Sequence, residues 1–417
     1  MDAPKKTALV LGGTAAHISL IENLKQRGYH TILVDYLPNP IAKPYADAHI
    51  QESGFDTDVV LRIAQGHNAD LVISTNLDFA NVVACEVGEK LGLPIPYSSE
   101  TARYSTQKDL MKERMTAFDI PTSRYVVGNC YEDVSNHQLR YPVMVKPVDR
   151  SGGFGVYKVS NPGDTPYYFQ KALDESGIGR ALIEEFVEGE QVSIDCFVQN
   201  GRAEVLLVRN ARVNKNKNAY YGLTYGAIIP ADISEKAKDA AKDVVKKIVA
   251  AFSLHTTFFL IQAIVNQDNV NVIEVALRVG GGASNVIIST ACSFDPIDAM
   301  VSSYLNLPIK HAAKRGGMPY LCRTLYARGG VFHKIAGHEE LLDEGVIAEF
   351  RCVKPHGAVI EPNSGTKHRV AYFLTSGDTL EEAFTKEEYA LGKIEAYDDK
   401  GKPMMVNEQF DSMCCIS

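Results

Sequence analysis

The 417-residue chain lacks the signatures of several large protein classes. Its eight cysteines include no Cys-x-x-Cys pair, so the sequence predicts no zinc site. No apolar run approaches the ~20 residues of a membrane-spanning helix, and the run near the start is too short for a signal peptide. These absences predict a cytoplasmic protein with free thiols and no membrane partner.

The chain also lacks an excess of positive charge. Its formal net charge is −8, its isoelectric point is about 5.8, and no basic stripe with interleaved aromatic residues occurs. This distribution excludes nucleic acid as an expected partner. Hydrophobic residues make up 45% and charged residues 23% of the chain, which is typical of a globular protein of about two to four domains.

The most informative segment is 262–282, which predicts two strands joined by the turn 266–269. Each strand carries an oxygen ligand, Gln262 or Glu274, and period-two alternation places Glu274, Ala276 and Arg278 on one face. A carboxylate and an amide oxygen suit Mg²⁺, and a guanidinium suits a phosphoryl group. The alternative is an edge hairpin with a solvated polar face.

A second segment predicts a phosphate-binding loop. A short apolar strand ends at Lys146, the glycine-rich loop 151–155 follows, and 156–159 is a second strand. Glycines let backbone N–H groups close on phosphate oxygens. The segment is neither a P-loop nor a dinucleotide fingerprint, because a strand rather than a helix comes next.

A third segment, 182–195, is predicted to be a strand, a short linker and a second strand. Such a linker offers backbone donors and acceptors to an adenine edge. An exposed glutamate-rich turn has the same composition.

Together with Lys108, these segments occur in the order and spacing of the ATP-grasp superfamily, which residues 5–310 resemble. The Gln…Glu pair is similar to the carbamoyl-phosphate synthetase branch. Segments between 345 and 394 resemble, more loosely, the C-terminal module of ATP-grasp L-amino-acid ligases and biotin-carboxylase-like enzymes.

The resemblance implies a role for each matching residue. Lys146 and Arg278 are expected to act in catalysis, and Gln262 and Glu274 to hold Mg²⁺, with Mn²⁺ as a possible replacement. The residues expected to contact ATP are Lys108, Lys146, Ser151, Gly152, Gly153, Gly155, Glu184, Glu185, Phe186, Val187, Glu190 and Gln191. Those expected to contact the second substrate are Tyr221, Arg278, Gly281, Gly282 and Asn285.

One position departs from the family pattern. Relatives place asparagine two residues after the second metal carboxylate, where this chain has Ala276. One neutral oxygen ligand is missing, and water can replace it because Mg²⁺ retains several waters. The departure leaves open a member that binds ATP but turns it over poorly.

The expected fold is α/β and α+β, with three parts. A Rossmann-like domain is predicted over 1–100, an ATP-grasp domain over 101–310 with a small lobe at about 124–187, and a C-terminal α+β module over 311–417. Apolar runs at 6–11, 31–35, 48–50 and 70–74 alternate with helical patterns, which indicates a parallel sheet. Helices are expected at 17–28, 106–118 and 232–252.

Three smaller features carry alternatives. Gly12-Gly13 with Asp35 permits a dinucleotide-binding interpretation, although the full glycine fingerprint is absent. Asp78, after the fourth run, either caps a helix or contacts substrate. The polar segment 209–222 is expected to be a loop that closes over the substrates, and an exposed, disordered loop has the same composition.

The sequence thus predicts an ATP-dependent carboxylate–amine ligase that forms an amide through an acyl phosphate, acting on an amino acid. The alternatives are a bicarbonate-activating enzyme and a non-catalytic ATP-binding regulatory subunit. The expected partners are small molecules, with a homodimer possible.

Overall fold

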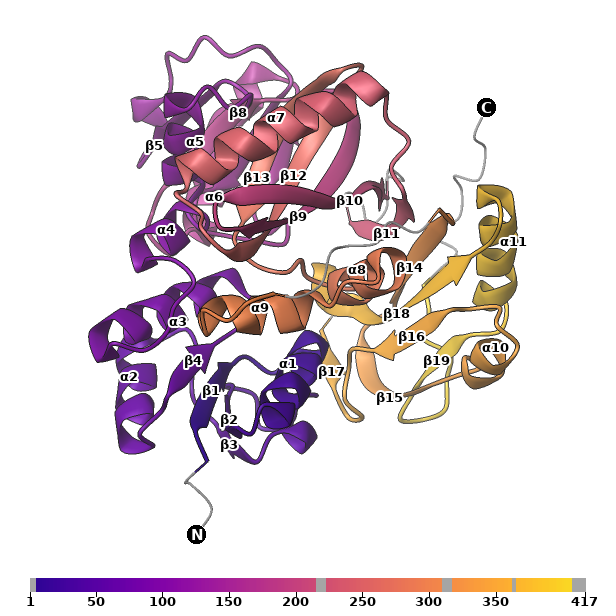
Figure 1. Ribbon diagram of the computed structural model, residues 1–417. Coiled ribbons are helices and arrows are strands. Elements are labelled where there is room, and N and C mark those ends of the chain that lie inside the picture. Colours follow the sequence, from indigo (N-terminus) through magenta and orange to yellow (C-terminus); the bar gives the residue numbers. More distant parts are fainter. Residues whose placement is uncertain (1–4, 215–222, 310–316, 362–364, 407–417) are drawn as a thin grey trace. The chain divides into compact units, whose positions relative to one another are not determined.

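The computed structural model describes residues 5–214, 223–309, 317–361 and 365–406 (Figure 1). The chain forms two compact units. Unit 1 comprises Met1–Pro96, Leu206–Ala231 and Arg278–Ser417, and unit 2 comprises Tyr97–Val205 and Asp232–Leu277. The three-part division expected from the sequence remains a prediction.

Unit 1 begins with the expected parallel sheet, whose strand order is β3-β2-β1-β4. The strands are β1 (Thr7–Leu11), β2 (His30–Val34), β3 (Ala48–Ile50) and β4 (Leu71–Ile73). Helix α1 (Ala15–Gln26) joins β1 to β2, α2 (Thr57–Gly66) joins β3 to β4, and α3 (Asp78–Leu91) follows β4. Between β2 and β3 the chain forms only a short 3-10 turn, Lys43–Tyr45. The predicted parallel sheet is confirmed, and α-helices alternate with its strands except between β2 and β3.

Helices cover both faces of this sheet, as a parallel sheet requires. Leu9, Leu11 and Ile32 belong to one buried cluster with apolar side chains of α2 and α3. The neighbouring side chains of each strand point to the opposite face of the sheet. Helix α1 contacts β1 and β2 there, with Leu20 and Leu24 buried. Figure 1 shows α1 on the opposite side of the sheet from α2 and α3.

The rest of unit 1 contains antiparallel strands in the order β10-β11-β14-β18-β16, and a small sheet in the order β17-β15-β19. The strands are β10 (Arg202–Val213, in unit 1 from Leu206), β11 (Thr224–Ile229), β14 (Tyr320–Tyr326), β15 (Gly330–Ala336), β16 (Glu349–Cys352), β17 (Val359–Ile360), β18 (Arg369–Ser376) and β19 (Glu395–Asp398). The helices are α8 (Ser284–Cys292), α9 (Pro296–Tyr304), α10 (Glu339–Asp343) and α11 (Leu380–Leu391). Phe332, Val370 and Phe373 lie in the buried core of this part.

Unit 2 contains two antiparallel groups of strands. The first has the order β5-β8-β6-β7, with β5 (Tyr125–Gly128), β6 (Val143–Pro147), β7 (Tyr157–Val159) and β8 (Ala181–Glu185), and α6 (Thr165–Glu175) packs on it through buried Phe169. The second has the order β13-β12-β9, with β9 (Glu190–Gln199), β12 (Thr257–Asn266) and β13 (Asn269–Ala276). The remaining helices are α4 (Ser99–Tyr104), α5 (Lys108–Ala117) and α7 (Glu235–Ala251).

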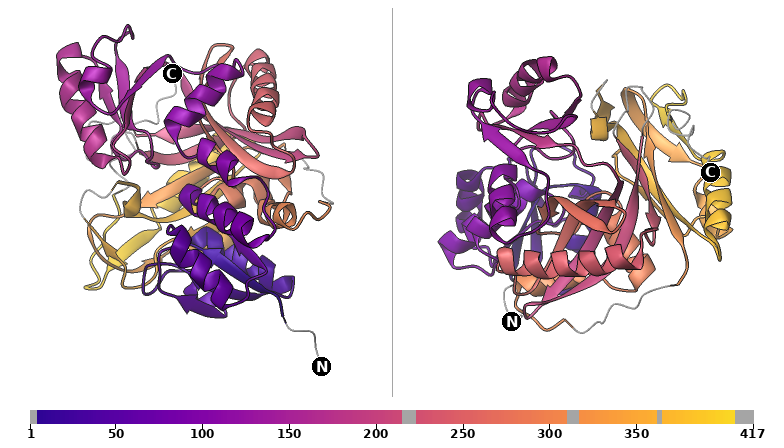
Figure 2. Two further views of the ribbon diagram at one scale, coloured as in Figure 1. Left: turned by 90° about the vertical axis from the view of Figure 1, so that its left-hand side faces the viewer. Right: turned by 90° about the horizontal axis from the view of Figure 1, so that it is seen from above.

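Helix α7 shows how the sequence specifies an amphipathic element. The Ser234 hydroxyl accepts a hydrogen bond from the Ala237 N–H and caps the helix start. Ala237, Ala241, Val244 and Ile248 form the buried stripe, and α7 packs against β13 and β9. Figure 1 shows α7 in front of this group of strands, and Figure 2 shows the molecule from two further sides. Three of its exposed lysines, Lys238, Lys242 and Lys246, pair with acidic residues three positions earlier and form a solvated face.

Two sequence-based expectations about local structure are wrong. The segment 209–222 is not a loop throughout, because residues 209–213 belong to β10. The Arg212 side chain is only 9% exposed there, and Glu387, from α11, neutralises it at 2.6 and 2.8 Å. The alternation of β13 does not extend to Arg278 either, since the strand ends at Ala276.

Within the described ranges, the structure contains no helix that is long and apolar enough to cross a membrane.

Candidate functional site

Gln262 and Glu274 face each other across neighbouring strands of unit 2. Their Cα atoms are direct register partners in the antiparallel pair β12–β13, with an irregularity immediately after Gln262. Both residues are partly exposed. Neither side chain has a hydrogen-bond or ion-pair partner among the residues that the structure describes. One carboxylate and one amide oxygen are therefore available side by side.

This donor set fits Mg²⁺ that keeps several waters and shares phosphate oxygens. No group of three His, Cys, Asp or Glu side chains suited to a metal occurs in the described part of the chain. Ala276, where the family pattern has asparagine, is 6% exposed and lies opposite Leu260, so it supplies no side-chain oxygen. The pair alone would leave most coordination positions to water and phosphate.

The glycine-rich loop connects β6 to β7, which pair antiparallel. Gly152, Gly153 and Gly155 adopt φ values of +70°, +81° and +67°, a region that other residues adopt only with strain. Lys108, the first residue of α5, donates its backbone N–H to the Val148 carbonyl at 2.8 Å, and its ammonium contacts the Arg150 carbonyl. Lys108 thereby ties the base of the loop to α5.

Lys146 belongs to a buried cluster that the sequence analysis missed in part. Glu184, on β8, accepts from the ammonium of Lys146 and lies 2.5 Å from the Lys112 nitrogen. The Lys112 ammonium also donates to the hydroxyls of Thr122 at 2.7 Å and Ser123 at 2.9 Å. The only sequence signal for Lys112 is its spacing, since residues i and i+4 of a helix share one face and Lys108 was already a candidate.

The two lysines determine the charge state of Glu184. Burial by itself raises the pKa of Glu184, but Lys146 and Lys112 outweigh it and lower the pKa to about 2. Burial lowers the pKa of Lys112 to about 8, against the opposing effect of Glu184. Because the Glu184 carboxylate is engaged by two cations, it holds the lysines in place.

The other residues predicted to contact ATP lie at the end of β8, in the linker that follows it and at the start of β9. The Glu185 carboxylate pairs with the exposed Arg140 at 2.9 Å, and the Lys158 ammonium lies 3.5 Å from the centre of the Phe186 ring. Glu190 and Gln191 open β9, opposite Val265 and Ile264. All these predicted residues, together with Ser151, lie in unit 2.

Arg278 lies in unit 1 and is held by a residue that the sequence did not connect with it. Its Nε and Nη2 donate to the two carboxylate oxygens of Asp78, each at 2.7 Å. The side chains are 14% and 10% exposed. Asp78 is the first residue of α3, so the parallel sheet positions the carboxylate that orients Arg278.

The predicted substrate loop follows Arg278 and leads into α8. Gly282 has a φ of +63°, and the oxygen of the Asn285 side chain is buried without a hydrogen-bond partner in the described structure. Tyr221, also predicted to contact substrate, lies outside the described residues.

The dinucleotide-binding interpretation is not supported. The Asp35 carboxylate accepts the backbone N–H groups of Gly13 at 2.7 Å and Leu37 at 2.8 Å. A Cβ on Gly13 would lie 2.3 Å from the Pro40 Cβ. Asp35 therefore stabilises a closely packed turn, which accounts for both the glycine and the carboxylate.

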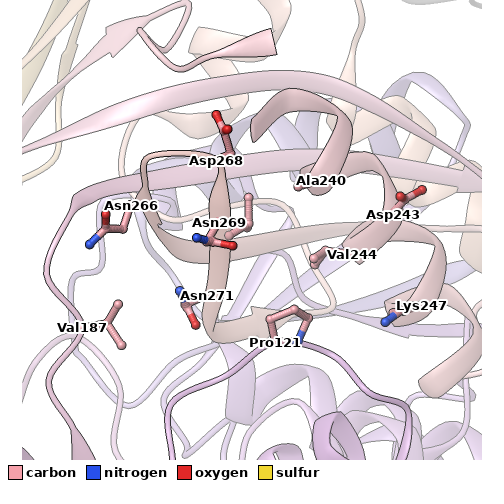
Figure 3. Close-up of a pocket in the computed structure, with 11 residues that line it drawn as sticks. Pro121, Val187, Ala240, Asp243, Val244, Lys247, Asn266, Asp268, Asn269 and Asn271 are labelled. Atoms are coloured by element: carbon pink, nitrogen blue, oxygen red, sulfur yellow. The ribbon is translucent and has the colours of Figure 1, made fainter. Parts of the chain in front are cut away.

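Unit 2 also has a surface hollow of about 540 Å³ beside α7 and the turn of the β12–β13 hairpin (Figure 3). Polar side chains line much of it, including Asn266, Asn271 and Asp268. Val187 is the one residue predicted to contact ATP that lines this hollow. The hollow is therefore a separate feature from the glycine loop and from the Gln262–Glu274 pair.

Comparisons with known proteins identify a domain within the chain. Residues 102–282 match the model of an ATP-grasp domain family. The chain is 21% identical over 304 residues to the multifunctional protein pyr-3 of Neurospora crassa, covering 70% of this chain and 16% of that protein. It is 26% identical over 191 residues to 3-methyl-D-ornithine–L-lysine ligase of Methanosarcina acetivorans, covering 46% of this chain and 47% of that protein.

Among solved structures, an L-amino acid ligase from Bacillus licheniformis superimposes with a TM-score of 0.76 at 19% identity, covering 96% of this chain and 100% of that one. That likeness extends over nearly the whole chain and defines the fold. Residues 102–282 are an ATP-grasp domain.

Proposed function

We propose that this protein is an ATP-dependent carboxylate–amine ligase that releases ADP and phosphate. The observation that carries the proposal is the cross-strand pair Gln262–Glu274, with unengaged oxygens, in the same ATP-grasp domain as Lys146 and its glycine loop. Ligases among the relatives and structural neighbours support the amide-forming reaction, and an amino acid is the proposed carboxylate substrate.

The chemistry consists of two group transfers. A carboxylate oxygen of the substrate attacks the γ-phosphorus of ATP, the bond to the bridging oxygen breaks, and ADP leaves. An amine then attacks the acyl carbon, phosphate leaves with the bonding electrons, and the amine loses a proton. No protein nucleophile is needed, so positioning and charge stabilisation supply most of the rate enhancement.

Each group of residues has a part in this scheme. Lys146 is proposed to neutralise phosphate charge, with Glu184 and Lys112 holding its ammonium. The glycine loop closes its N–H groups on phosphate oxygens and excludes water, which would hydrolyse an acyl phosphate. Mg²⁺, where bound by Gln262 and Glu274, would neutralise charge on the phosphates. Arg278, oriented by Asp78, would stabilise the transferring phosphoryl group.

The direct test is phosphate release from Mg-ATP with single amino acids, amino-acid pairs, other carboxylates with amines, and bicarbonate. Release that requires both a carboxylate and an amine is expected. Release with bicarbonate alone would instead identify a bicarbonate-activating enzyme. ATP binding without release under every condition would contradict the ligase proposal.

One observation favours a second candidate, an ATP-binding regulatory protein with little turnover. Ala276 contributes no oxygen beside the Gln262–Glu274 pair. If the missing ligand limits activity, Ala276→Asn should raise turnover, whereas an active wild type rules this candidate out.

Replacing Gly153 should impair the glycine loop. We expect Gly153→Pro to slow turnover by about 10²-fold, because proline fixes φ near −65° and the native φ is +81°. Steady-state kinetics and nucleotide binding would be measured together, with Gly163→Ala on the same lobe as the control. Equal losses in turnover and in adenine nucleotide affinity would contradict a role in closing over phosphates.

Removing the carboxylate that orients Arg278 should lower turnover without changing the KM for ATP. We expect Asp78→Asn to reduce kcat by ~10- to 100-fold, since the lost charge-assisted pair is worth about 1.5–3 kcal/mol. The KM for ATP should not change, because the proposed ATP contacts lie in unit 2. Asp298→Asn is the matched control, since Asp298 pairs with Arg27 at 2.5 Å in the same unit. Equal kinetics in the two variants would remove the proposed role of Asp78.

A further inference from the structure

Two further arginines lie beside the loop that joins Arg278 to α8. Arg209, on β10, is 7% exposed and donates from Nη2 to the Ser284 hydroxyl at 2.7 Å. Arg369, the first residue of β18, approaches the loop from another strand, so that a Cβ on Gly282 would lie 3.2 Å from its Nη1. The absence of a side chain at Gly282 leaves room for this guanidinium.

Arg369 differs from the other arginines nearby in how its charge is balanced. Arg212 is neutralised by Glu387, and Arg278 is neutralised by Asp78. Over the described ranges, Arg369 forms no ion pair, and its Nε is shielded from solvent without a hydrogen-bond partner. Arg369 as a whole is partly exposed, but a shielded donor on a cation normally has a partner. The arrangement therefore indicates that an anion completes it.

The surroundings increase the positive potential at this point. Burial lowers the pKa of Lys354, and the positive charges of Lys367 and Arg369 lower it further. Burial raises the pKa of Cys322 to about 12, against the opposing charges of Arg209 and Arg369.

Helix α8 adds to that potential. It starts at Ser284 beside both arginines, and its N-cap residue, Ala283, provides no side-chain acceptor. The partial positive charge of a helix N-terminus favours a bound anion. The helix end and the two guanidinium groups thus act on the same small region.

We propose that the substrate phosphorylated by this enzyme carries a second anionic group, a carboxylate or a phosphate, which Arg369 binds together with Arg209 at the start of α8. This inference rests on the ligase function proposed above. The carboxylate that reacts would lie at Arg278, and the second group would lie at Arg369. Arg369 and Arg209 are thus specificity-determining residues, because a neutral substituent would leave the Arg369 charge unpaired.

The test compares acids that differ only in the second group. Phosphate release would be measured with glutamate against glutamine, aspartate against asparagine, and 3-phosphoglycerate against glycerate, each with the same amines. We expect the wild type to prefer the doubly anionic acid by ~10- to 100-fold in kcat/KM, from a charge-assisted contact of about 1.5–3 kcal/mol. The carboxylate and phosphate pairs show which anion the site accepts.

Variants separate specificity from a general loss of activity. Arg369→Gln should abolish the preference, because kcat/KM for the doubly anionic acids should fall by ~10- to 100-fold towards that for the neutral acids. Arg351→Gln is the control, because Arg351 lies on the neighbouring strand, is 58% exposed and pairs with Glu349. A wild type without preference, or an Arg369→Gln variant that weakens both classes of acid equally, would overturn the proposal.

A binding measurement keeps the inference testable if no acid supports turnover. Succinate and inorganic phosphate should raise the melting temperature of the wild type and not that of Arg369→Gln. No turnover with this thermal shift would contradict the ligase proposal alone. No shift with either anion would reject the anion site.

Discussion

The Glu274→Gln variant is expected to lose ATP turnover by about 10²- to 10³-fold while remaining folded. The substitution keeps the size of the side chain and removes the one carboxylate of the Gln262–Glu274 pair. A metal ion at the phosphates contributes several kcal/mol to the transition state, and each ~1.4 kcal/mol corresponds to tenfold in rate. Glu274 has no partner among the residues described here, so its replacement disrupts no ion pair.

Two companion variants make the result interpretable. Gln262→Glu should retain activity, because an oxygen ligand survives at that position. Glu204→Gln removes an exposed carboxylate of β10 in the same unit and should have no effect. Mg²⁺ titration of turnover would show whether Glu274→Gln needs more metal. Near-normal turnover in Glu274→Gln would remove the metal role and weaken the proposed reaction.

The second large effect concerns stability. We expect Glu184→Gln to lower the free energy of unfolding by about 3–5 kcal/mol, because it leaves two buried lysines without their counter-charge. The Lys112 and Lys146 side chains are 1% and 6% exposed. Urea denaturation followed by a probe in unit 2 would measure the change. A loss below ~1 kcal/mol would show that the lysines find other acceptors.

The neighbouring glutamate is the matched control. Glu185 pairs with Arg140 and Arg124, whose side chains are 84% and 63% exposed. Solvent can replace such a partner, so Glu185→Gln should cost no more than ~1 kcal/mol. Equal losses in the two variants would contradict a special role for the buried cluster.

The pH dependence of stability should also show the contribution of the Glu184 carboxylate. The folded-state pKa of Glu184, about 2, lies below its ordinary value of 4.5, so its stabilising contribution is complete above pH 4.5 and is lost as the pH falls towards 2. Glu184→Gln should lack this component of acid destabilisation. If the free energy of unfolding fell with pH in the same way in wild type and Glu184→Gln, this contribution of Glu184 would be contradicted.

Local patterns were sufficient to predict much of the fold. The apolar runs at 6–11 and 31–35 became β1 and β2, and the predicted hairpin became β12 and β13 with Gln262 opposite Glu274. These elements depend on side-chain periodicity and on turn residues, which the sequence displays within a few positions. The chemical types of the candidate ligands were evident for the same reason.

The sequence misled where buried charge was involved. Residues 209–213 look like part of a polar loop, yet they form a strand whose Arg212 is neutralised by Glu387, 175 positions away. A polar residue favours a loop only when no partner compensates its burial. No local pattern shows that partner.

The sequence by itself therefore determined the order of the elements, the hairpin with Gln262 and Glu274, the lysine with its glycine loop, and the ATP-grasp domain. Only the tertiary structure decided which charges meet: Lys112 with Glu184, Asp78 with Arg278 across 200 positions, and Arg369 with the loop at Gly282. Strand and helix patterns follow from interactions between near neighbours in the chain, whereas an ion pair depends on where folding brings distant segments together.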